Sequence, residues 1–414
     1  MAEGSGPSKI GLNAETNLEL LTVPAKTIAE EAPHDLPALH IFERGNKGPK
    51  VRLCAVGDIG LSGRAAATAK HRGPEILFGE VASVLRTADI TFGNLESPLA
   101  SDIAPGDMFA APITGAATLC NTGFNILHLA NNHVGEYGQA GLIATLAAVR
   151  EAGILCLGAG NNATEAQQLI RTDTNNLRVG WLGCGRTLLA QRKTGPQYWE
   201  FNEKQLLAAI GCERSKVDVL IVSIHIGLMY MDYPRPEHKS VAERLMERGA
   251  DLILMHHAHV LQGVQVVPQG QVCCYNLGNF LYDWQEGDVQ TPIMLREQNE
   301  GGIFLFEIDK QGVALAAVLP TWIDDSCCVH WATGERGHRI LRRLGRISRD
   351  LEGDFALAFE RQRAERNLGL IFKVLLFHVR HWDWRYFIDA MRRIRFEHLR
   401  MLVQWIGQWK SVKP

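Results

Sequence analysis

Apolar runs and helix-like segments alternate along most of the chain. Short apolar runs at residues 51–56, 88–95, 124–130, 154–160, 177–185 and 217–226 are typical of buried strands. The segments at residues 74–87, 113–122, 138–153 and 236–250 indicate helices. Beyond residue 260 the pattern predicts two hairpins, with turns at residues 268–270 and 310–312. This order predicts an α/β fold with mixed sheet pairing.

The two ends of the chain depart from this pattern. Residues 1–50 are polar and interrupted by prolines, so we expect a loosely ordered N-terminal arm. Residues 51–325 form the predicted α/β domain. Residues 326–414 form a separate helical region, which is rich in aromatic residues and has 12 Lys and Arg against four Asp and Glu from Arg361 onward.

Two interpretations of this basic C-terminal region stay open. In the first, its helices pack on the core or on another copy of the chain, with arginines on the solvent side. In the second, an amphipathic surface makes peripheral contact with an anionic membrane through Trp382, Trp384, Trp405 and Trp409. In either case we predict an appendage that flanks the core and is not a catalytic domain.

Composition narrows the classes of function. The net charge of −2 excludes a globally basic nucleic-acid binder, and no nucleic-acid motif is present. The nine cysteines include no CxxC pair and lie mostly in apolar runs, which is typical of reduced thiols. The first residues lack the pattern of a secretory leader, and no apolar run is long enough to span a bilayer. We therefore expect a cytoplasmic protein.

Polar residues that can bind metals follow five of the predicted strands. These are Gly57-Asp58, residues 93–96 with Asn94 and Glu96, residues 131–133, His225, and residues 256–259 with three histidines. Ligands bind outside the carboxyl ends of strands in open α/β sheets. Carboxylate and imidazole together suit Mn, Fe, Zn or Mg. The sequence therefore predicts a site for one or two divalent ions at these strand ends.

Each piece alone has a simpler explanation. Gly57-Asp58 is typical of a turn or a helix cap, and His225 at the end of an apolar strand is typical of a core histidine. The cluster His256-His257-Ala258-His259 has no obvious role in a core. The recurrence at five strand ends is what favours a metal site.

The same motifs, in this order, resemble the CapA family of capsule or poly-γ-glutamate biosynthesis proteins, which belongs to the calcineurin-like metallophosphoesterase superfamily. The resemblance covers roughly residues 51–325 and also includes residues 276–280, Asn-Leu-Gly-Asn-Phe. It implies a four-layer αββα metallophosphoesterase-like sandwich with a divalent-metal centre. The chain departs from hydrolytic phosphoesterases at Gly60, where they carry a histidine, and at Asn94, where they carry a bridging aspartate.

The resemblance also implies roles for individual residues. The implied metal ligands are Asp58, Glu96, Asn132, His225, His257 and His259. His133 and Glu96 would take part in catalysis, His133 by protonating a leaving group. We expect substrate contacts from Asn94, Asn131, His256, Tyr230 and Arg235, the last two from the aromatic, proline-rich segment after His225.

Three functions remain open from the sequence. The simplest is a CapA-like, metal-dependent hydrolase of a phosphoester or related bond, linked to polymer or peptide metabolism. The second is metal-assisted proton transfer, such as epimerisation, or amide chemistry on a peptide or poly-amino-acid substrate. The third is a non-catalytic accessory subunit of a polymer synthase. The expected partners are a small-molecule, peptide or polymer substrate and no nucleic acid, and association into oligomers stays open.

Overall fold

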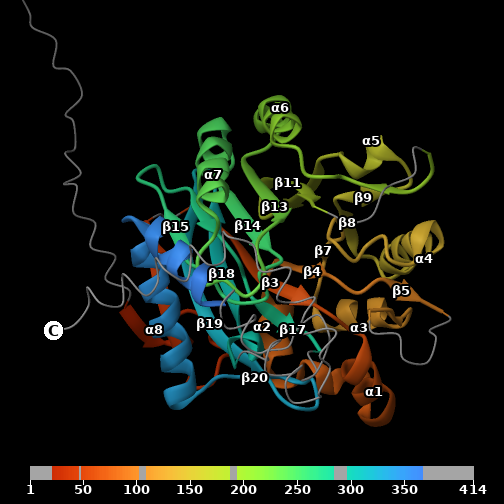
Figure 1. Cartoon of the computed structure of the whole chain (residues 1–414), viewed down its shortest axis with the longest axis horizontal. Coiled ribbons are helices and arrows are strands. Elements are labelled where there is room, and N and C mark those ends of the chain that lie inside the picture. The colour runs from red at the N-terminus through yellow and green to blue at the C-terminus, as the bar shows by residue number, and fades with distance from the viewer. Residues whose placement is uncertain (1–20, 46–47, 102–108, 187–193, 284–295, 367–414) are drawn as a thin grey trace, which may run out of the picture.

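Two β-sheets face each other at the centre of the molecule (Figure 1). The computed structural model describes residues 21–45, 48–101, 109–186, 194–283 and 296–366. Within these residues the larger sheet has ten strands. Eight follow the order β1 (Leu21–Pro24), β2 (Pro37–Glu43), β19 (Gly312–Ile323), β18 (Glu300–Asp309), β3 (Val51–Ile59), β4 (Ile90–Leu95), β7 (Ile126–His128) and β8 (Leu155–Leu157). Two more pair off this path: β17 (Asn279–Leu281) with β3, and β20 (Val329–Trp331) with β19.

The second sheet has six strands in the described residues. Their order is β10 (Ile170–Thr174), β11 (Leu177–Gly185), β13 (Val219–His225), β14 (Leu252–His256), β16 (Val272–Cys274) and β15 (Val264–Val266). Two small ribbons pair β12 (Gln197–Tyr198) with β9 (Ala159–Gly160) and β5 (Leu99–Ala100) with β6 (Ala111–Pro112). The α-helices are α1 (Gly63–Arg72), α2 (Ala82–Thr87), α3 (Gly115–Thr122), α4 (Gly138–Glu151), α5 (Ala163–Ala166), α6 (Glu203–Glu213), α7 (Pro236–Arg248) and α8 (Gly334–Asp350). Short 3₁₀ turns occur at Ala25–Thr27, Pro74–Leu77, Gly79–Val81, Arg214–Lys216 and Arg296–Asn299.

Alternating side chains of the central strands build separate cores on the two faces of each sheet. On β3, Leu53 and Ala55 point into the core between the sheets, whereas Cys54 and Val56 point into the core under the helices. The inner core includes Phe92 of the large sheet stacked on Trp181 of the small one, with ring centroids 5.4 Å apart.

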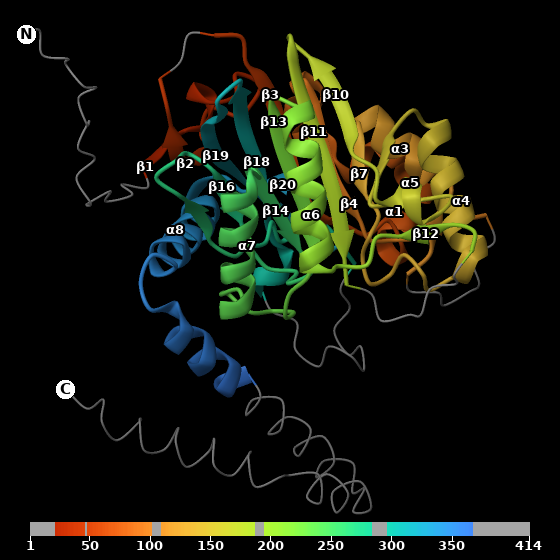
Figure 2. The ribbon, with the colours of Figure 1, turned by 90° about the horizontal axis from the view of Figure 1, so that it is seen from above.

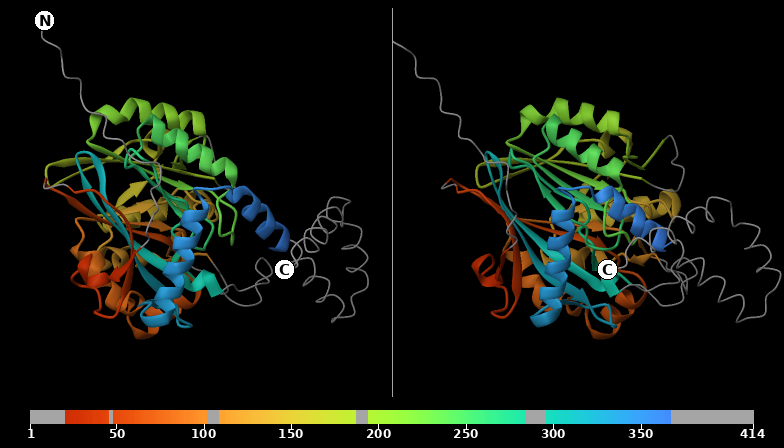
Figure 3. Two further views of the ribbon diagram at one scale, coloured as in Figure 1. Left: turned by 90° about the vertical axis from the view of Figure 1, so that its left-hand side faces the viewer. Right: turned by 60° about the vertical axis from the view of Figure 1, so that its left-hand side comes forward.

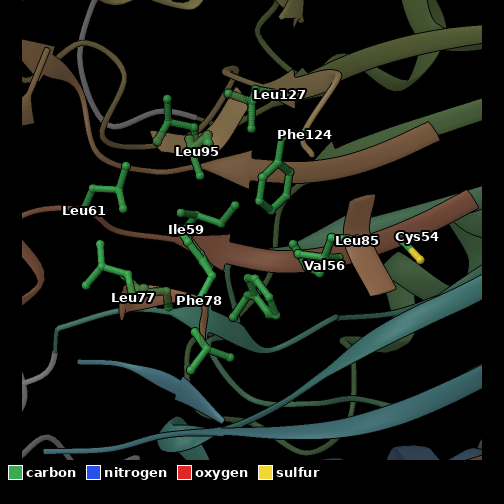
Figure 4. Packing of buried hydrophobic residues seen from close by; sticks show 14 of the residues in the cluster. Cys54, Val56, Ile59, Leu61, Leu77, Phe78, Leu85, Leu95, Phe124 and Leu127 are labelled. Carbon is green, nitrogen blue, oxygen red and sulfur yellow. The ribbon is translucent and has the colours of Figure 1, made fainter. Parts of the chain in front are cut away.

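Helices cover the outer face of each sheet. Leu206 and Ile210 of α6 and Leu245 of α7 pack on the outside of the six-stranded sheet, where Figures 2 and 3 show the two helices side by side. Ile59, Leu95 and Phe124 pack with Leu77 and Phe78 on the outside of the larger sheet (Figure 4). The predicted four-layer αββα sandwich is confirmed.

The N-terminal region differs from the predicted loose arm. Strands β1 and β2 pair with each other, β2 pairs with β19, and Leu39 lies in the core between the sheets. Both prolines of this ribbon, Pro24 and Pro37, stand at strand ends, where a missing N–H costs no ladder bond. The short apolar runs that end at Pro24 and begin at Pro37 are therefore strands, which the proline content concealed. Residues 1–20 lie outside the described residues.

The C-terminal region begins with helices that pack on the sandwich. Ile340, Leu341 and Leu344 of α8 enter the core between the sheets. Residues 355–366 are also helical, and Phe355 and Phe359 are buried against the small-sheet side. Residues 367–414, which include the four tryptophans of the membrane interpretation, lie outside the described residues. Within the described part of the chain, no helix combines the length and apolar character needed to cross a membrane.

Candidate metal centre

Parallel pairing brings the first two motifs side by side in the large sheet. Asp58 on β3 is in register with Asn94 on β4, and Nδ2 of Asn94 donates to Oδ1 of Asp58 at 2.8 Å. Glu96 follows β4 directly and is held by a bond from its backbone N–H to the carbonyl of Ile59 at 2.9 Å. The carboxylates of Asp58 and Glu96 are both completely buried. Two acidic groups therefore lie together at the carboxyl ends of adjacent strands.

A close backbone approach explains the glycine before Asp58. A Cβ atom at Gly57 would lie 1.9 Å from the carbonyl oxygen of Gly278. The loop with Gly278 passes directly against β3, and the N–H of Asp58 donates to the Gly278 carbonyl at 2.9 Å. The Gly-Asp motif is thus required by packing here and is more than a simple turn.

The turn after β7 carries the Asn-Asn-His motif toward the same point. Nδ2 of Asn131 donates to the carbonyl of Leu95 at 2.8 Å, and its Oδ1 accepts from the N–H of His133 at 3.2 Å. Asn131 therefore shapes the turn. Its neighbour Asn132 directs Oδ1 to within 2.6 Å of Nε2 of His225.

The histidines come from the small sheet. His225 and His256 are the last residues of β13 and β14 and are in register with each other. His257 and His259 follow with φ angles of 96° and 57°, a left-handed backbone that non-glycine residues rarely adopt. Such strain at two residues of one short loop is typical of functional loops. Nδ1 of His257 lies 3.2 Å from Nε2 of His225.

All of these side chains meet around Glu96. Its Oε1 lies 3.6 Å from Nε2 of His225, 3.7 Å from Nε2 of His259 and 3.6 Å from Nε2 of His133. Two overlapping groups have ligand atoms within 4.8 Å of one another: Asp58, Glu96 and His225, and Glu96, His257 and His259. Glu96 belongs to both, which is the position of a ligand shared between two ions.

The donor set fits a divalent cation. Both carboxylate oxygens of Glu96 are buried and have no hydrogen-bond partner among the described residues. A buried carboxylate without a partner is costly, and a cation compensates for it. The surrounding imidazole nitrogens and the amide oxygen of Asn132 complete a mixed N and O site that suits Mn, Fe, Zn or Mg. We therefore expect Asp58, Glu96, Asn132, His225, His257 and His259 to hold the ion or ions.

Burial and neighbouring charges shift the pKa values of the candidate ligands in different directions. Burial and the nearby Asp58 charge raise the pKa of Glu96 well above its usual value. Burial alone would raise the pKa of Asp58, but hydrogen bonds and charge from His256 and His259 hold it well below the usual value. Burial lowers the pKa of His225, and burial together with the His259 charge lowers that of His257 to about 3. His225 and His257 are therefore neutral, which is the form that binds metals.

His259 is oriented by a residue that sequence reasoning did not assign. Nδ1 of His259 lies 2.9 Å from Oδ1 of Asn279, whose Nδ2 donates to the carbonyl of Gln298 at 2.9 Å. Because the amide oxygen only accepts, Nδ1 of His259 carries a hydrogen, and Nε2 lies on the side of Glu96. Burial alone would lower the pKa of His259, but the charges of Glu96 and Asp58 raise it to about 9. A cation bound at Nε2 would therefore displace a proton from it. The Asn-Leu-Gly-Asn-Phe motif contained Asn279, but nothing local linked it to His259.

Three of the predicted substrate contacts have no exposed surface. Asn94, Asn131 and His256 are completely buried. Nδ1 of His256 lies 3.4 Å from Oδ1 of Asp58, and its ring is stacked nearly parallel to that of His225. These side chains lie behind the candidate ligands and contact them, so the geometry favours a supporting role, and their substrate contacts stay a prediction.

The other two predicted substrate contacts lie in the segment between β13 and α7. Tyr230 is half-buried, and its ring centroid is 6.1 Å from that of His259. Arg235 is exposed and directly precedes α7. Tyr282, which sequence reasoning missed, lies closer, with its ring centroid 4.9 Å from that of His259. Burial and the charges of Glu96 and Asp58 raise the pKa of Tyr282.

His133 stands between the ligands and solvent. Its Nδ1 lies 2.6 Å from Oε1 of Glu136, and its ring stacks on Phe109 at 4.5 Å between centroids. Because a carboxylate accepts, Nδ1 carries the hydrogen and Nε2 faces Glu96. Glu136 was not among the predicted residues; only its position three residues after His133 hinted at the pair.

Solved structures with similar architecture include phosphatases. A phosphatase from Mycoplasma pneumoniae aligns with 66% of this chain and 93% of its own length, at 13% identity and a TM-score of 0.42. The 5'-nucleotidase of Candida albicans aligns with 75% of this chain and 60% of its own length, at 9% identity and a TM-score of 0.37.

Relatives in sequence include two CapA proteins. The capsule biosynthesis protein CapA of Bacillus anthracis is 27% identical over 309 residues, which cover 71% of this chain and 73% of that protein. The PGA biosynthesis protein CapA of Bacillus subtilis is 26% identical over 281 residues, which cover 66% of this chain and 71% of that protein. A probable polyglutamine synthesis accessory protein of Mycobacterium tuberculosis is 24% identical over 245 residues, which cover 54% of this chain and 63% of that protein.

The family profile spans the candidate ligands. The profile described as bacterial capsule synthesis protein PGA_cap matches residues 52–284, which include every motif from Gly57-Asp58 to the loop of Asn279. The resemblance deduced from the motifs is thereby confirmed, and this chain belongs to the PGA_cap family of bacterial capsule synthesis proteins.

Proposed function

We propose that the chain is a metal-dependent hydrolase that acts on a phosphoester or a related bond in polymer or peptide metabolism. One observation carries this proposal: the completely buried carboxylate of Glu96 has no hydrogen-bond partner among the described residues and is surrounded by imidazole nitrogens from both sheets. That arrangement is costly unless a cation occupies it.

A divalent cation held here would supply Lewis-acid chemistry, by lowering the pKa of water and stabilising negative charge on a phosphoryl oxygen. The chain supplies the other parts. Glu136 fixes the ring of His133 through Nδ1, so that Nε2 is the atom that transfers a proton to a leaving oxygen. Tyr230 and Tyr282 flank His259, and Arg235 offers positive charge at the rim for an anionic substrate.

Assays on the full chain loaded with Mn²⁺ test this proposal. The wild type should hydrolyse an aryl phosphate such as p-nitrophenyl phosphate, and Asp58→Asn and His257→Ala should lose both metal and activity. His133→Asn should keep its metal while turnover falls by about 10²–10⁴-fold. His330→Asn is the matched control, because His330 is an exposed histidine of β20 that pairs with Asp324.

Two results would reject the proposal. A wild-type chain that binds no divalent ion would remove the metal centre. A metal-loaded chain that turns over no phosphoester would remove the hydrolase, and a peptide or poly-amino-acid substrate would then be the probe for amide chemistry or epimerisation.

A second candidate is an accessory role in polymer synthesis. It is favoured by the name of the Mycobacterium tuberculosis relative, a probable polyglutamine synthesis accessory protein. In that case the metal would stabilise the fold, and the chain would catalyse no reaction itself. The Asp58→Asn variant would then support the activity of a synthase less well than the wild type does. Phosphoester turnover by the isolated chain would exclude a purely accessory role.

We further propose a cytoplasmic location. The support is chemical: all nine cysteines are free, and burial raises the pKa of Cys54 to about 12. Six of the nine are buried, and buried, reduced thiols are typical of reducing compartments. Cell fractionation with an antibody against the chain would test the location.

A further inference from the structure

The segment between β13 and α7 forms one side of the metal centre. We name residues 229–235 the rim loop. It begins four residues after His225, carries Tyr230 beside His259, and ends at Arg235. Tyr230 has a φ angle of 63°, the same left-handed region as His257 and His259. Because such a backbone is unfavourable for tyrosine, the surrounding contacts must hold it in place.

The inner side of the rim loop is attached to the ligand loop. The N–H of Tyr230 donates to the carbonyl of Ala258 at 2.7 Å, between the candidate ligands His257 and His259. Nε2 of Gln262 donates to the carbonyl of Met231 at 2.8 Å. A displacement of the rim loop would therefore move Tyr230 relative to His257 and His259.

The outer side is held by the C-terminal helices. Nη2 of Arg343 on α8 donates to Oδ1 of Asp232 at 2.7 Å, and the N–H of Asp232 donates to Oε1 of Gln362 at 2.9 Å. Nη2 of Arg366 lies 4.0 Å from Oδ1 of Asp232. The side chains of Asp232 and Arg343 are only 16% and 14% exposed. This ion pair is therefore shielded from solvent, unlike the surface pairs that contribute little.

A second set of contacts holds the next residue. The hydroxyl of Tyr233 donates to Oδ2 of Asp350 at 2.6 Å and accepts from Nη1 of Arg346 at 3.0 Å. Its ring lies 6.5 Å from that of Phe355. Two consecutive residues of the rim loop thus have their polar groups bound by residues 343–366.

The helices that hold the loop are themselves fixed to the sandwich. Ile340, Leu341 and Leu344 of α8 are buried between the sheets, and Oγ of Ser348 accepts from the N–H of Val264 at 2.9 Å. These helices lie outside residues 52–284, the part of the chain that the family profile matches. They connect a region beyond the matched segment to the edge of the metal centre.

We propose that α8 and the helical residues 355–366 act as a clamp that sets the position of the rim loop, with Asp232 and Arg343 as its positioning residues. The clamp fixes Tyr230 at the metal centre, and so controls how a substrate is held without touching the substrate or the metal. The part of this proposal that concerns substrate rests on the proposed hydrolase function.

Arg343→Gln in the full chain tests the clamp, and Arg342→Gln is its matched control. Arg342 is the neighbouring residue of α8, but it is 65% exposed and pairs with the 77% exposed Glu335. Three readouts are needed on Mn²⁺-loaded protein: Mn²⁺ content, amide hydrogen exchange of residues 229–235, and KM and kcat for p-nitrophenyl phosphate.

In Arg343→Gln we expect unchanged Mn²⁺ content and exchange of residues 229–235 faster by on the order of tenfold. KM should rise on the order of tenfold, since a small displacement of a positioning group has large effects. Arg342→Gln should match the wild type. Asp232→Asn should reproduce Arg343→Gln, and the double variant should be no worse than either single one, because the two residues share one contact.

Arg343→Lys keeps the positive charge, so its KM and its exchange at residues 229–235 should lie between those of Arg343→Gln and the wild type. It also replaces Arg343→Gln in the test if that variant does not fold. Unchanged exchange at residues 229–235 would overturn the clamp, and so would a loss of Mn²⁺ that parallels the change in KM. If the wild type turns over no aryl phosphate, the hydrolase function fails, while the exchange comparison still decides on the clamp.

Discussion

Oδ1 of Asn132 lies 2.6 Å from Nε2 of His225 and joins the two sheets of the sandwich. Asn132 follows β7 of the large sheet, and His225 ends β13 of the small one. The candidate metal centre is therefore assembled from both sheets. Its carboxylates come from the large sheet and most of its imidazoles from the small one, so the ion would also bind the two halves of the fold together.

Glu96→Gln should reduce metal affinity more than Asn94→Ala. The Glu96 carboxylate is a candidate ligand in both three-residue groups, whereas Asn94 acts through its bonds to Asp58 and His225. Loss of a supporting residue typically costs about 10–100-fold in metal affinity, and we expect loss of the ligand to exceed this. Metal content per chain, measured by mass spectrometry after dialysis, gives the order. Glu136→Gln is the control that should keep the metal, and a larger effect of Asn94→Ala than of Glu96→Gln would show that the motif is assigned wrongly.

Removing the metal should destabilise the wild type but not Glu96→Gln. A ligand that binds only the folded state at 100 times its Kd stabilises it by about 2.7 kcal/mol, so a chelator should lower the Tm of the wild type. Without metal, Glu96→Gln should be at least as stable as the wild type, because it removes a buried carboxylate that has no partner among the described residues. Calorimetry with and without chelator measures both effects. A metal-free Glu96→Gln variant that melts well below the metal-free wild type would contradict this account.

The stabilisation contributed by Asp232 should depend on pH. Burial alone would raise the pKa of Asp232, but the charge and hydrogen bond of Arg343 outweigh burial and hold the pKa below its usual value. A depressed pKa means that the contribution is complete above the unfolded value of about 3.9 and is lost as the pH falls through the folded value. The difference in unfolding free energy between wild type and Asp232→Asn should be constant from neutral pH to about pH 5 and shrink below about pH 4. Urea unfolding over this range measures it, and a difference that grows toward acid would have the wrong sign.

The basic C-terminal sequence gives a prediction about membranes. If residues 367–414 contact an anionic bilayer, the full chain should co-sediment with phosphatidylserine vesicles at low salt and dissociate at high salt. Neutral vesicles are the control. No sedimentation at low salt would leave packing on protein as the role of this region.

The sequence by itself determined the identities of the candidate ligands. Asp58, Glu96 and His225 each follow an apolar run that is long enough only for a buried strand, and such strands place their carboxyl ends at one edge of a sheet. Local periodicity and local polarity therefore predicted the α/β class and a metal site at the strand ends, while the four-layer sandwich and the roles of individual ligands came from the resemblance of the motifs to the CapA family. The same signals misled at the N-terminus, where prolines at strand ends concealed β1 and β2.

Only the tertiary structure decided what each polar residue faces. The sequence places Asn94 and Asn131 among the expected substrate contacts, yet both side chains are completely buried behind the candidate ligands. Nothing local links Asn279 and Asp232 to their partners, because His259 and Arg343 lie 20 and 111 positions away along the chain. Local periodicity reports which face of an element is buried but not which distant element covers it. The packing of the two sheets and of α8 against each other settles that question.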